Sequence, residues 1–245
     1  MGGLVGGVSS KIVLVAATLT FTARVDREHV RAMLAPQAAV SAVSARLSQK
    51  VHLPGDDDAT ARRRARDRID IGIGAEEMRV DAKIVSDATL PKDVDLRIGR
   101  DMLDHMIDVD LKRHRIRLLL RSEAAGATRG RTAIPLTPRA DGRWTMPATV
   151  AGIAGETAIL DFASTAEVQV PAAAADLARI ADGAKVAVTL GAARPIDLRV
   201  QRDAGAEALP VVGWQTFAGR DVLLDLGHDR IWLEGAAGKT ARSGS

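Results

Sequence analysis

The stretch Trp144–Pro171, WTMPATVAGIAGETAILDFASTAEVQVP, decides which fold the chain can adopt. It predicts a strand over Ala148–Gly152, a tight turn over Ile153–Gly155 and a returning strand over Thr157–Leu160. Short β-type segments separated by glycine-containing turns are typical of hairpins. A third apolar segment, Val168–Val170, follows after a loop. The stretch therefore predicts a small β unit with a loop between its second and third strands.

Asp161 lies where the apolar returning strand ends and the loop of small residues begins. A carboxylate at that point would lie beside an apolar wall and accept hydrogen bonds from the backbone N–H groups of the loop. Such a setting suits a structural acceptor that caps its own loop, and it equally suits a reactive group. On the sequence alone, both interpretations of Asp161 stay open.

The segment around Asp161 resembles the active-site segment of retropepsin-like aspartic peptidases, in which an apolar strand leads into Asp-Thr-Gly followed by Ser or Thr. Asp161 matches the acid, and Ser164 and Thr165 match the residues behind it. Phe162 and Ala163 stand where the family has Thr and Gly. The resemblance implies an all-β fold of two acid-protease-type β-barrel lobes, with a short helix in each lobe and a cleft between them.

The first half of the chain repeats this plan without the acid. A strand over Phe21–Val25, a polar turn and a return over Val30–Leu34 align with the hairpin before Asp161. In this alignment Ala35 takes the position of Asp161, and small residues follow it. The resemblance therefore implies a catalytic position at Asp161 and an empty one at Ala35. It also implies substrate contacts from both loops, through Phe162, Ala163, Ser164, Pro36, Gln37 and Ala38.

A second module follows the loop in each half, in the same order. Leu96–Gly99 and Val211–Gly213 are each an apolar segment closed by glycine, with a short helix and a closing hairpin expected after it. The glycine is needed where a strand crosses closely behind the loop, because no side chain fits there. Two components repeated in the same order indicate an internal duplication.

The repeat predicts an N-terminal lobe over residues 12–121 and a C-terminal lobe over 132–234, joined by a linker over 122–131. We expect residues 1–11 to be disordered or foreign to the natural chain, and 235–245 to form a disordered tail. An internal pair of lobes is compatible with a monomer, because it removes the need for the homodimer that single-lobe relatives require.

Composition narrows the classes of function. The chain has 245 residues, a formal net charge of +3 and no cysteine. Interspersed charges of both signs argue against nucleic-acid binding, which needs a concentrated basic face. No metal site or cofactor is expected, because there is no thiolate and the histidines are scattered. Lys11–Phe21 is too short to span a bilayer and is expected to be a strand. The compartment, exported or periplasmic on one hand and cytoplasmic on the other, stays open.

The resemblance implies hydrolysis of peptide bonds by two aspartates that share a proton and activate a water. Ala35 can supply neither charge nor proton, and losing one member of such a pair removes most of the rate. The chain is therefore expected to be inactive or crippled. It would be a natural pseudopeptidase, or an enzyme in which Ala35 replaces the catalytic acid to give an inactive form. In a third interpretation the chain is an active enzyme, and another acid, for instance one of Asp56–Asp58, moves into the site as the second carboxylate.

An interpretation of another class is a β-rich module with no catalytic ancestry. It would hold a peptide or protein in the groove between the lobes or at a strand edge. In both classes the expected partner is a polypeptide segment in extended conformation. Other conspicuous residues have structural interpretations: Asp110 and Asp225 as turn or ion-pair acids, and Trp144, Trp214 and Trp232 as core or lobe-packing anchors.

Overall fold

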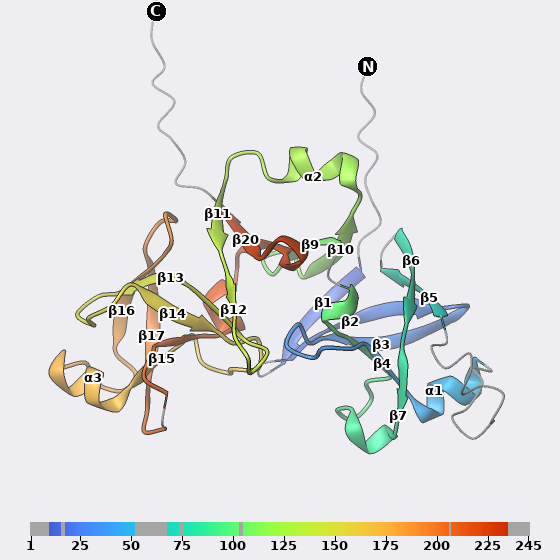
Figure 1. The fold of residues 1–245 in the computed structure, drawn as a ribbon, viewed down its shortest axis with the longest axis horizontal. Coiled ribbons are helices and arrows are strands. Elements are labelled where there is room, and N and C mark those ends of the chain that lie inside the picture. The colour runs from blue at the N-terminus through green and yellow to red at the C-terminus, as the bar shows by residue number, and fades with distance from the viewer. Residues whose placement is uncertain are drawn as a thin grey trace, which may run out of the picture.

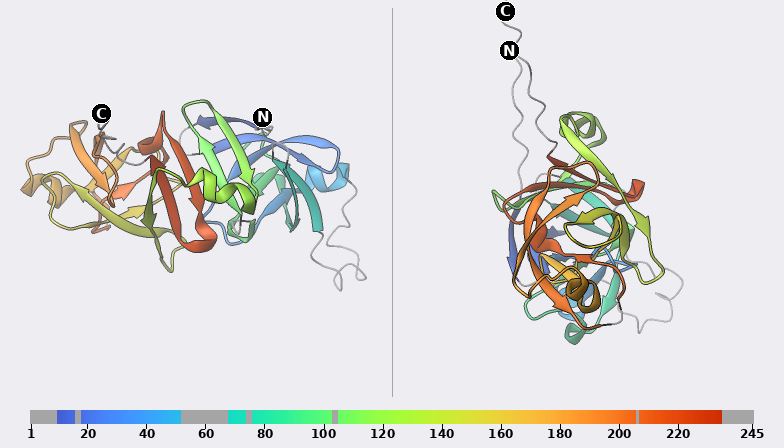
Figure 2. Two further views of the ribbon diagram at one scale, coloured as in Figure 1. Left: turned by 90° about the horizontal axis from the view of Figure 1, so that it is seen from above. Right: turned by 90° about the vertical axis from the view of Figure 1, so that its left-hand side faces the viewer.

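The computed structural model in Figure 1 shows two β-rich lobes side by side along the long axis of the molecule, as the further views in Figure 2 also show. It describes residues 10–15, 18–51, 68–73, 76–102, 105–205 and 207–234. The all-β, two-lobe fold class is confirmed. The predictions for the chain ends before residue 10 and after residue 234, and for Asp56–Asp58, lie outside the described residues.

The first lobe holds β3 and β4 on either side of β8, with β3 parallel and β4 antiparallel to it. Its strands are β1 (Ser10–Val15), β2 (Thr18–Val25), β3 (Glu28–Leu34), β4 (Ala42–Ser44), β5 (Arg68–Ile73), β6 (Glu76–Asp81), β7 (Lys83–Val85) and β8 (Leu96–Ile98). Its helical turns are α1 (Ala45–Lys50), η2 (Asp87–Thr89) and η3 (Arg100–Met102). The hairpin predicted around residues 26–29 corresponds to β2–β3, and β5 pairs with β6 in the same antiparallel way.

The second lobe repeats this arrangement as a closed ring, because β13 pairs with β14 on one side and with β16 on the other. Its strands are β12 (Thr137–Pro138), β13 (Trp144–Val150), β14 (Thr157–Leu160), β15 (Val168–Pro171), β16 (Lys185–Leu190), β17 (Ile196–Asp203) and β18 (Val211–Val212). Its helical turns are α3 (Ala172–Leu177) and η4 (Trp214–Phe217). Closure of the ring removes the unpaired edges that an open sheet would expose.

A further sheet joins the lobes, and each half of the chain contributes to it. Its order is β11-β20-β19-β9-β10-β1, and the antiparallel ladder between β9 and β19 connects the two halves. The new elements are β9 (Met106–Asp110), β10 (Arg115–Leu119), β11 (Arg131–Pro135), β19 (Asp221–Asp225), η5 (Leu226–His228) and β20 (Arg230–Glu234). The two closing hairpins predicted from the sequence therefore pair with each other. The predicted linker segment contains helix α2 (Arg121–Ala127).

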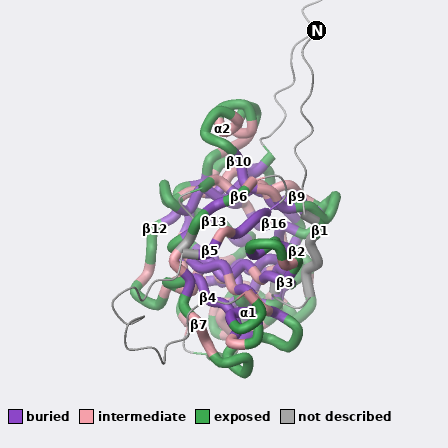
Figure 3. Tube along the Cα trace, turned by 90° about the vertical axis from the view of Figure 1, so that its right-hand side faces the viewer, coloured by how far each residue is buried: buried purple, intermediate pink, exposed green. Residues whose placement is uncertain are grey.

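The core follows from alternation along the strands, since successive side chains of a strand point to opposite faces. In β13, for example, Trp144, Met146, Ala148 and Val150 are buried, and the residues between them are more exposed. Figure 3 shows buried residues running along the strands while the turns between them are exposed. Trp144 and Trp214 are 1% and 0% exposed, which confirms them as core anchors, whereas Trp232 of β20 is only half-buried.

Helices α1 and α3 were not predicted, although they occupy equivalent places after β4 and β15. Ser44 caps α1, with its side chain accepting a hydrogen bond from the backbone N–H of Leu47. Both helices have six residues, too short for a hydrophobic period to be visible in the sequence. Within the described residues, no helix has the length and apolar character needed to cross a membrane.

Candidate functional site

The two loops singled out by the sequence lie at equivalent places in the two lobes. After β3, the backbone N–H of Ala35 donates to the carbonyl of Ile98 at 2.9 Å. After β14, the backbone N–H of Asp161 donates to the carbonyl of Val212 at 3.0 Å. Each loop therefore begins by binding the strand that ends in the predicted glycine.

The two glycines allow those strands to cross directly behind the loops. A Cβ added to Gly99 would lie 2.7 Å from the carbonyl oxygen of Val40. A Cβ added to Gly213 would lie 2.5 Å from the carbonyl oxygen of Ala166. Real Cβ atoms do not approach backbone oxygens this closely, so the prediction that close approach requires glycine is confirmed at both positions.

One turn reaches both loops. It joins β12 to β13 over residues 139–143, and a Cβ added to Gly142 would lie 2.9 Å from the carbonyl oxygen of Gln37. Arg100 Nη2 donates to the carbonyl of Gly142 at 2.7 Å, and its guanidinium lies 4.6 Å from the centre of the Trp144 ring. The turn of the second lobe is thereby held against the first lobe.

The carboxylate of Asp161 is engaged on both oxygens. Oδ1 accepts a hydrogen bond from the backbone N–H of Ala163 at 2.8 Å, so Asp161 caps its own loop. Oδ2 lies 3.7 Å from Nη1 of Arg143, which comes from the turn that also reaches Gln37. The acid therefore combines a structural hydrogen bond with an ion pair, and the position equivalent to it carries the methyl group of Ala35.

Arg143 is itself the centre of a charged cluster. Its Nη2 lies 2.7 Å from Oδ2 of Asp141 and 2.8 Å from Oε2 of Glu207. The hydrogen bond to Asp141, followed by that to Glu207, raises the pKa of the guanidinium despite its partial burial. The same contacts, reinforced by Arg139, hold the pKa of the Asp141 carboxyl well below its usual range. Arg143 and Asp141 are thus both ionised at neutral pH.

The residues predicted to contact a substrate are not equally accessible. Phe162 is 3% exposed, and its ring lies 4.5 Å from that of Trp214 and 5.7 Å from that of Trp144. Ser164 is also buried and accepts a hydrogen bond from the backbone N–H of Ala166. Phe162 and Ser164 therefore use their side chains to pack and fix the loop, and a contact of either residue with a ligand stays a prediction.

In the first lobe Ala35 and Pro36 are buried, and Gln37 and Ala38 are half-buried. Oε1 of Gln37 is buried and has no hydrogen-bond partner within the described residues. Of the predicted contacts in the second lobe, Ala163 is exposed. Apart from Gln37, the predicted contact residues left near the surface, Ala38 and Ala163, carry only a methyl group, so these two positions offer little that could recognise a ligand.

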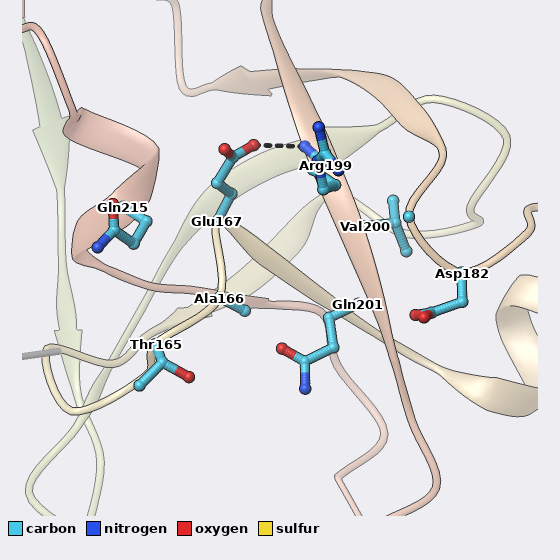
Figure 4. Close-up of a pocket in the computed structure, with 9 residues that line it drawn as sticks. Thr165, Ala166, Glu167, Asp182, Arg199, Val200, Gln201 and Gln215 are labelled. Carbon is cyan, nitrogen blue, oxygen red and sulfur yellow. Dashed lines mark hydrogen bonds between the residues drawn. The ribbon is translucent and has the colours of Figure 1, made fainter. Parts of the chain in front are cut away.

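A hollow on the second lobe was missed by the sequence analysis. It has a volume of about 480 Å³ and is lined by Thr165, Ala166, Glu167, Asp182, Gly183, Arg199, Val200, Gln201 and Gln215. Figure 4 shows that the lining comes from the loop after Asp161, from the segment before β16 that holds Asp182, from β17 and from η4. These residues are far apart in the sequence, and no motif links them.

The hollow is formed where two parallel strands separate. Val168 of β15 pairs with Val200 of β17, and before this pair the carboxylate of Glu167 accepts the backbone N–H of Arg199. Asp182 likewise accepts the backbone N–H of Arg202. The guanidinium of Arg199 is exposed and has no ion-pair partner in the described part of the chain. The hollow therefore offers a free cation beside hydroxyl and amide groups.

Two further predictions concern acids at hairpin ends. The carboxylate of Asp110 accepts hydrogen bonds from the backbone N–H of Arg113 at 2.8 Å and from its guanidinium at 3.0 Å. Asp225 lies 2.6 Å from Nδ1 of His228. Both acids fix turns, as predicted.

Among the described residues there is no group of three or more His, Asp or Glu side chains that could hold a metal ion.

Solved structures share the fold. The basic 7S globulin from soybean superposes with a TM-score of 0.61 at 9% sequence identity, covering 93% of this chain and 95% of the globulin chain. Conglutin gamma, described as a unique basic 7S globulin from lupine seeds, gives a TM-score of 0.60 at 11% identity, covering 93% and 94%. No family model and no curated protein matches the sequence. At these identities the comparisons define the fold, a two-lobe β architecture.

These structures correct the interpretation of the chain as a retropepsin-like aspartic peptidase, which is wrong. The features behind that interpretation were an apolar strand before a loop, a glycine at a crossing and a closing hairpin. Each is a requirement of backbone packing in the two-lobe fold, as Gly99 and Gly213 demonstrate. A fold-level requirement carries no information about chemistry, which depends on the side chains of the site.

Proposed function

We propose that the protein binds a polypeptide ligand without hydrolysing it, and that the hollow beside the Asp161 loop is the binding site. The main support for the non-catalytic half of the proposal is the ion pair between Asp161 and Arg143. A general acid or base needs a proton that can be exchanged with the substrate. Asp161 is instead held by a guanidinium and by its own loop, and its counterpart is Ala35.

The lining of the hollow supports a polypeptide as the ligand. Gln201 carries a side-chain amide, which can donate and accept as a peptide group does, and Thr165 carries a hydroxyl that can do both. The guanidinium of Arg199 suits a carboxylate, which it can bind with two parallel hydrogen bonds. An extended peptide with an acidic side chain meets all three groups. The hollow is also open enough to take a chain that continues beyond it.

The binding half is tested by selecting linear peptides from a displayed library on the full-length protein and measuring their dissociation constants by fluorescence anisotropy. Arg199→Ala is expected to weaken the selected peptides by about 10-fold or more, the effect of losing a charged hydrogen bond. Arg27→Ala, which changes an exposed arginine in a turn of the first lobe, is the matched control. Asp161→Asn is expected to leave binding unchanged. Equal weakening by Arg27→Ala and Arg199→Ala would refute the site.

The non-catalytic half is tested with a casein substrate between pH 3 and pH 7. Neither the natural chain nor Ala35→Asp is expected to cleave it, because Asp161 is already paired with Arg143. The double variant Ala35→Asp with Arg143→Met removes that pairing and shows whether the cation alone blocks the reaction. Cleavage by the natural chain above that of a heat-denatured sample would refute the proposal.

A further inference from the structure

Acidic residues gather on one face of the sheet that joins the lobes. In the ladder between β9 and β19, Asp108 pairs with Leu223, and Asp110 pairs with Asp221. Because Ile107 and the other intervening residues point into the core, the acids share the opposite face. Asp108 and Asp221 are diagonal neighbours on that face, within reach of each other. One comes from each half of the chain.

The guanidinium groups around this pair satisfy one oxygen of each acid. Arg117 Nε lies 2.9 Å from Oδ2 of Asp108, and Arg131 Nη2 lies 2.5 Å from Oδ2 of Asp221. The remaining oxygens, Oδ1 of Asp108 and Oδ1 of Asp221, are both buried and lack a donor within the described residues. A buried acceptor without a donor is costly, and two facing each other would also repel if both carboxyls were ionised.

We propose that Asp108 and Asp221 share a proton across the junction between the lobes, which makes the strength of that junction depend on pH. One proton held between the carboxyl groups supplies the missing donor and removes one of the two like charges. The bond then formed links β9 to β19 and hence the first lobe to the second. Loss of the proton leaves two carboxylates opposed across the same ladder.

The electrostatics of the pair agree with this geometry. Burial, the hydrogen bond with Asp221 and the negative charge of Asp221 raise the pKa of Asp108 to about 6, whereas Arg117 acts in the opposite direction. In an unfolded chain the pKa of an aspartate is about 3.9. The folded protein therefore binds the extra proton between about pH 4 and pH 6.

The other charged groups facing the pair do not take the proton. Glu123 of α2 is engaged by Arg117 at 3.3 Å. Burial would raise the pKa of Asp110, but the hydrogen bonds and charge of Arg113, together with the charge of Arg115, outweigh it and lower that pKa. The negative charges of Asp221 and Asp108 also contribute to the raised pKa of Arg113. The neighbouring acid is thus ionised when Asp108 is protonated.

The sign of the effect follows from proton linkage. Because the folded pKa of Asp108 is above the unfolded one, its contribution to stability is complete below the unfolded value and is lost as the pH rises through about 6. From pH 5 to pH 7, a shift from about 3.9 to about 6 raises the unfolding constant by about 10-fold through this group alone.

Urea unfolding of the full chain at pH 5 and pH 7 tests the proposal. Asp108→Asn places a permanent amide donor against Asp221, so the 10-fold rise is expected to disappear. Asp70→Asn is the control, because Asp70 is in an exposed pair with Arg79 that lowers its pKa and does not titrate in this range. If Asp108→Asn keeps the natural dependence on pH, the proposal is overturned.

Two further measurements keep the test valid if Asp108→Asn fails to fold. Asp221→Asn, which places the amide on the other strand, is expected to remove the same dependence. In the natural chain, NMR of the aspartate carboxyl carbons is expected to show one group of the pair titrating near pH 6. If both carboxyls instead titrate below pH 5, no proton is shared and the proposal fails.

Discussion

The loop of residues 35–41 in the first lobe and the loop of residues 161–167 in the second follow the same path but are fixed by different groups. In the first, buried Ser41 donates its backbone N–H and its hydroxyl to Asp101, and its hydroxyl accepts the backbone N–H of Gly99. In the second loop Glu167 is the residue equivalent to Ser41. Its backbone carbonyl accepts hydrogen bonds from the hydroxyl of Thr216 and from the backbone N–H of Gly213.

The difference has a consequence for function. In the first loop the side chain of Ser41 closes the structure, so Ser41 has no group left to reach outward. In the second the backbone carbonyl of Glu167 does the same task, and its carboxylate is free to line the hollow and to accept the backbone N–H of Arg199. A duplicated unit can thus keep one backbone path while only one copy presents polar groups to a ligand.

The interior sides of the loops differ as well. Phe162 packs among Trp144 and Trp214, whereas its counterpart Pro36 contributes a small buried ring. Replacing Phe162 with Ala should have the largest effect of any single substitution in these loops, a loss of about 4 kcal/mol in the free energy of unfolding. Pro36→Ala should cost about 1 kcal/mol or less. Urea unfolding of both variants measures the difference, and equal losses would contradict it.

The crossing glycines should be nearly as sensitive. Gly213→Ala places a Cβ against the carbonyl oxygen of Ala166, and Gly99→Ala does the same against Val40. Each is expected to lose about 3 kcal/mol, because backbone must move to relieve the overlap. Gly126→Ala in α2 is the control, because a Cβ added there would meet nothing within 4 Å beyond its own helix backbone. It should raise the free energy of unfolding by about 0.5 kcal/mol. A tolerated Gly213→Ala would show that the strand can withdraw from the loop.

The fixing groups of the two loops should differ in strength. Asp101→Ala leaves the buried N–H and hydroxyl of Ser41 without an acceptor and should cost about 2 kcal/mol. Thr216→Val removes one neutral hydrogen bond to the carbonyl of Glu167 and should cost about 1 kcal/mol. Hydrogen exchange of the loop amides checks that each loss is local. The comparison fails if Thr216→Val is the more harmful change.

The smallest effect is expected for the ion pair on Asp161. Arg143→Met removes this pair together with the closer pairs to Asp141 and Glu207. It should cost about 1 kcal/mol or less at low salt, because all of these pairs are partly exposed. The loss should shrink as salt is added, since screening already weakens the pair. Thermal unfolding at low and high salt measures it, with Arg79→Met on an exposed hairpin pair as the control. A loss that does not depend on salt would indicate packing by the arginine stem instead.

Local patterns in the sequence were sufficient for the hairpins β2–β3 and β13–β14 and for the repeated order of elements, whereas Lys11–Phe21, expected to be one strand, contributes to the two paired strands β1 and β2. The alternation in β13 and the polar turns between hairpins are visible without a structure, and so are the two glycines at crossings. Helices α1 and α3 were missed because a single turn or two carries no readable period. The pairing of β9 with β19 joins segments from the two predicted lobes, and neither segment alone carries a signal for it.

The site was less predictable than the fold. Asp161 and Ala35 do occupy equivalent loops, but Phe162 and Ser164 turned out to be buried. Arg143 could not be linked to Asp161 from the sequence, because an ion pair between separate hairpins leaves no spacing signal. The hollow lined by Glu167 and Arg199 was missed for the same reason.

By itself the sequence determined the β class, the repeated order of strand, loop and glycine, and the absence of an acid at position 35. These depend on local alternation and on residue identity. The tertiary structure alone decided that Asp161 is paired with Arg143, that Asp108 meets Asp221 between the lobes, and that Arg199 donates its backbone N–H to Glu167 beside the hollow. The reason is physical: the charge and protonation of a carboxyl group depend on which groups lie within a few ångströms, and strand pairing brings those groups together from distant parts of the chain.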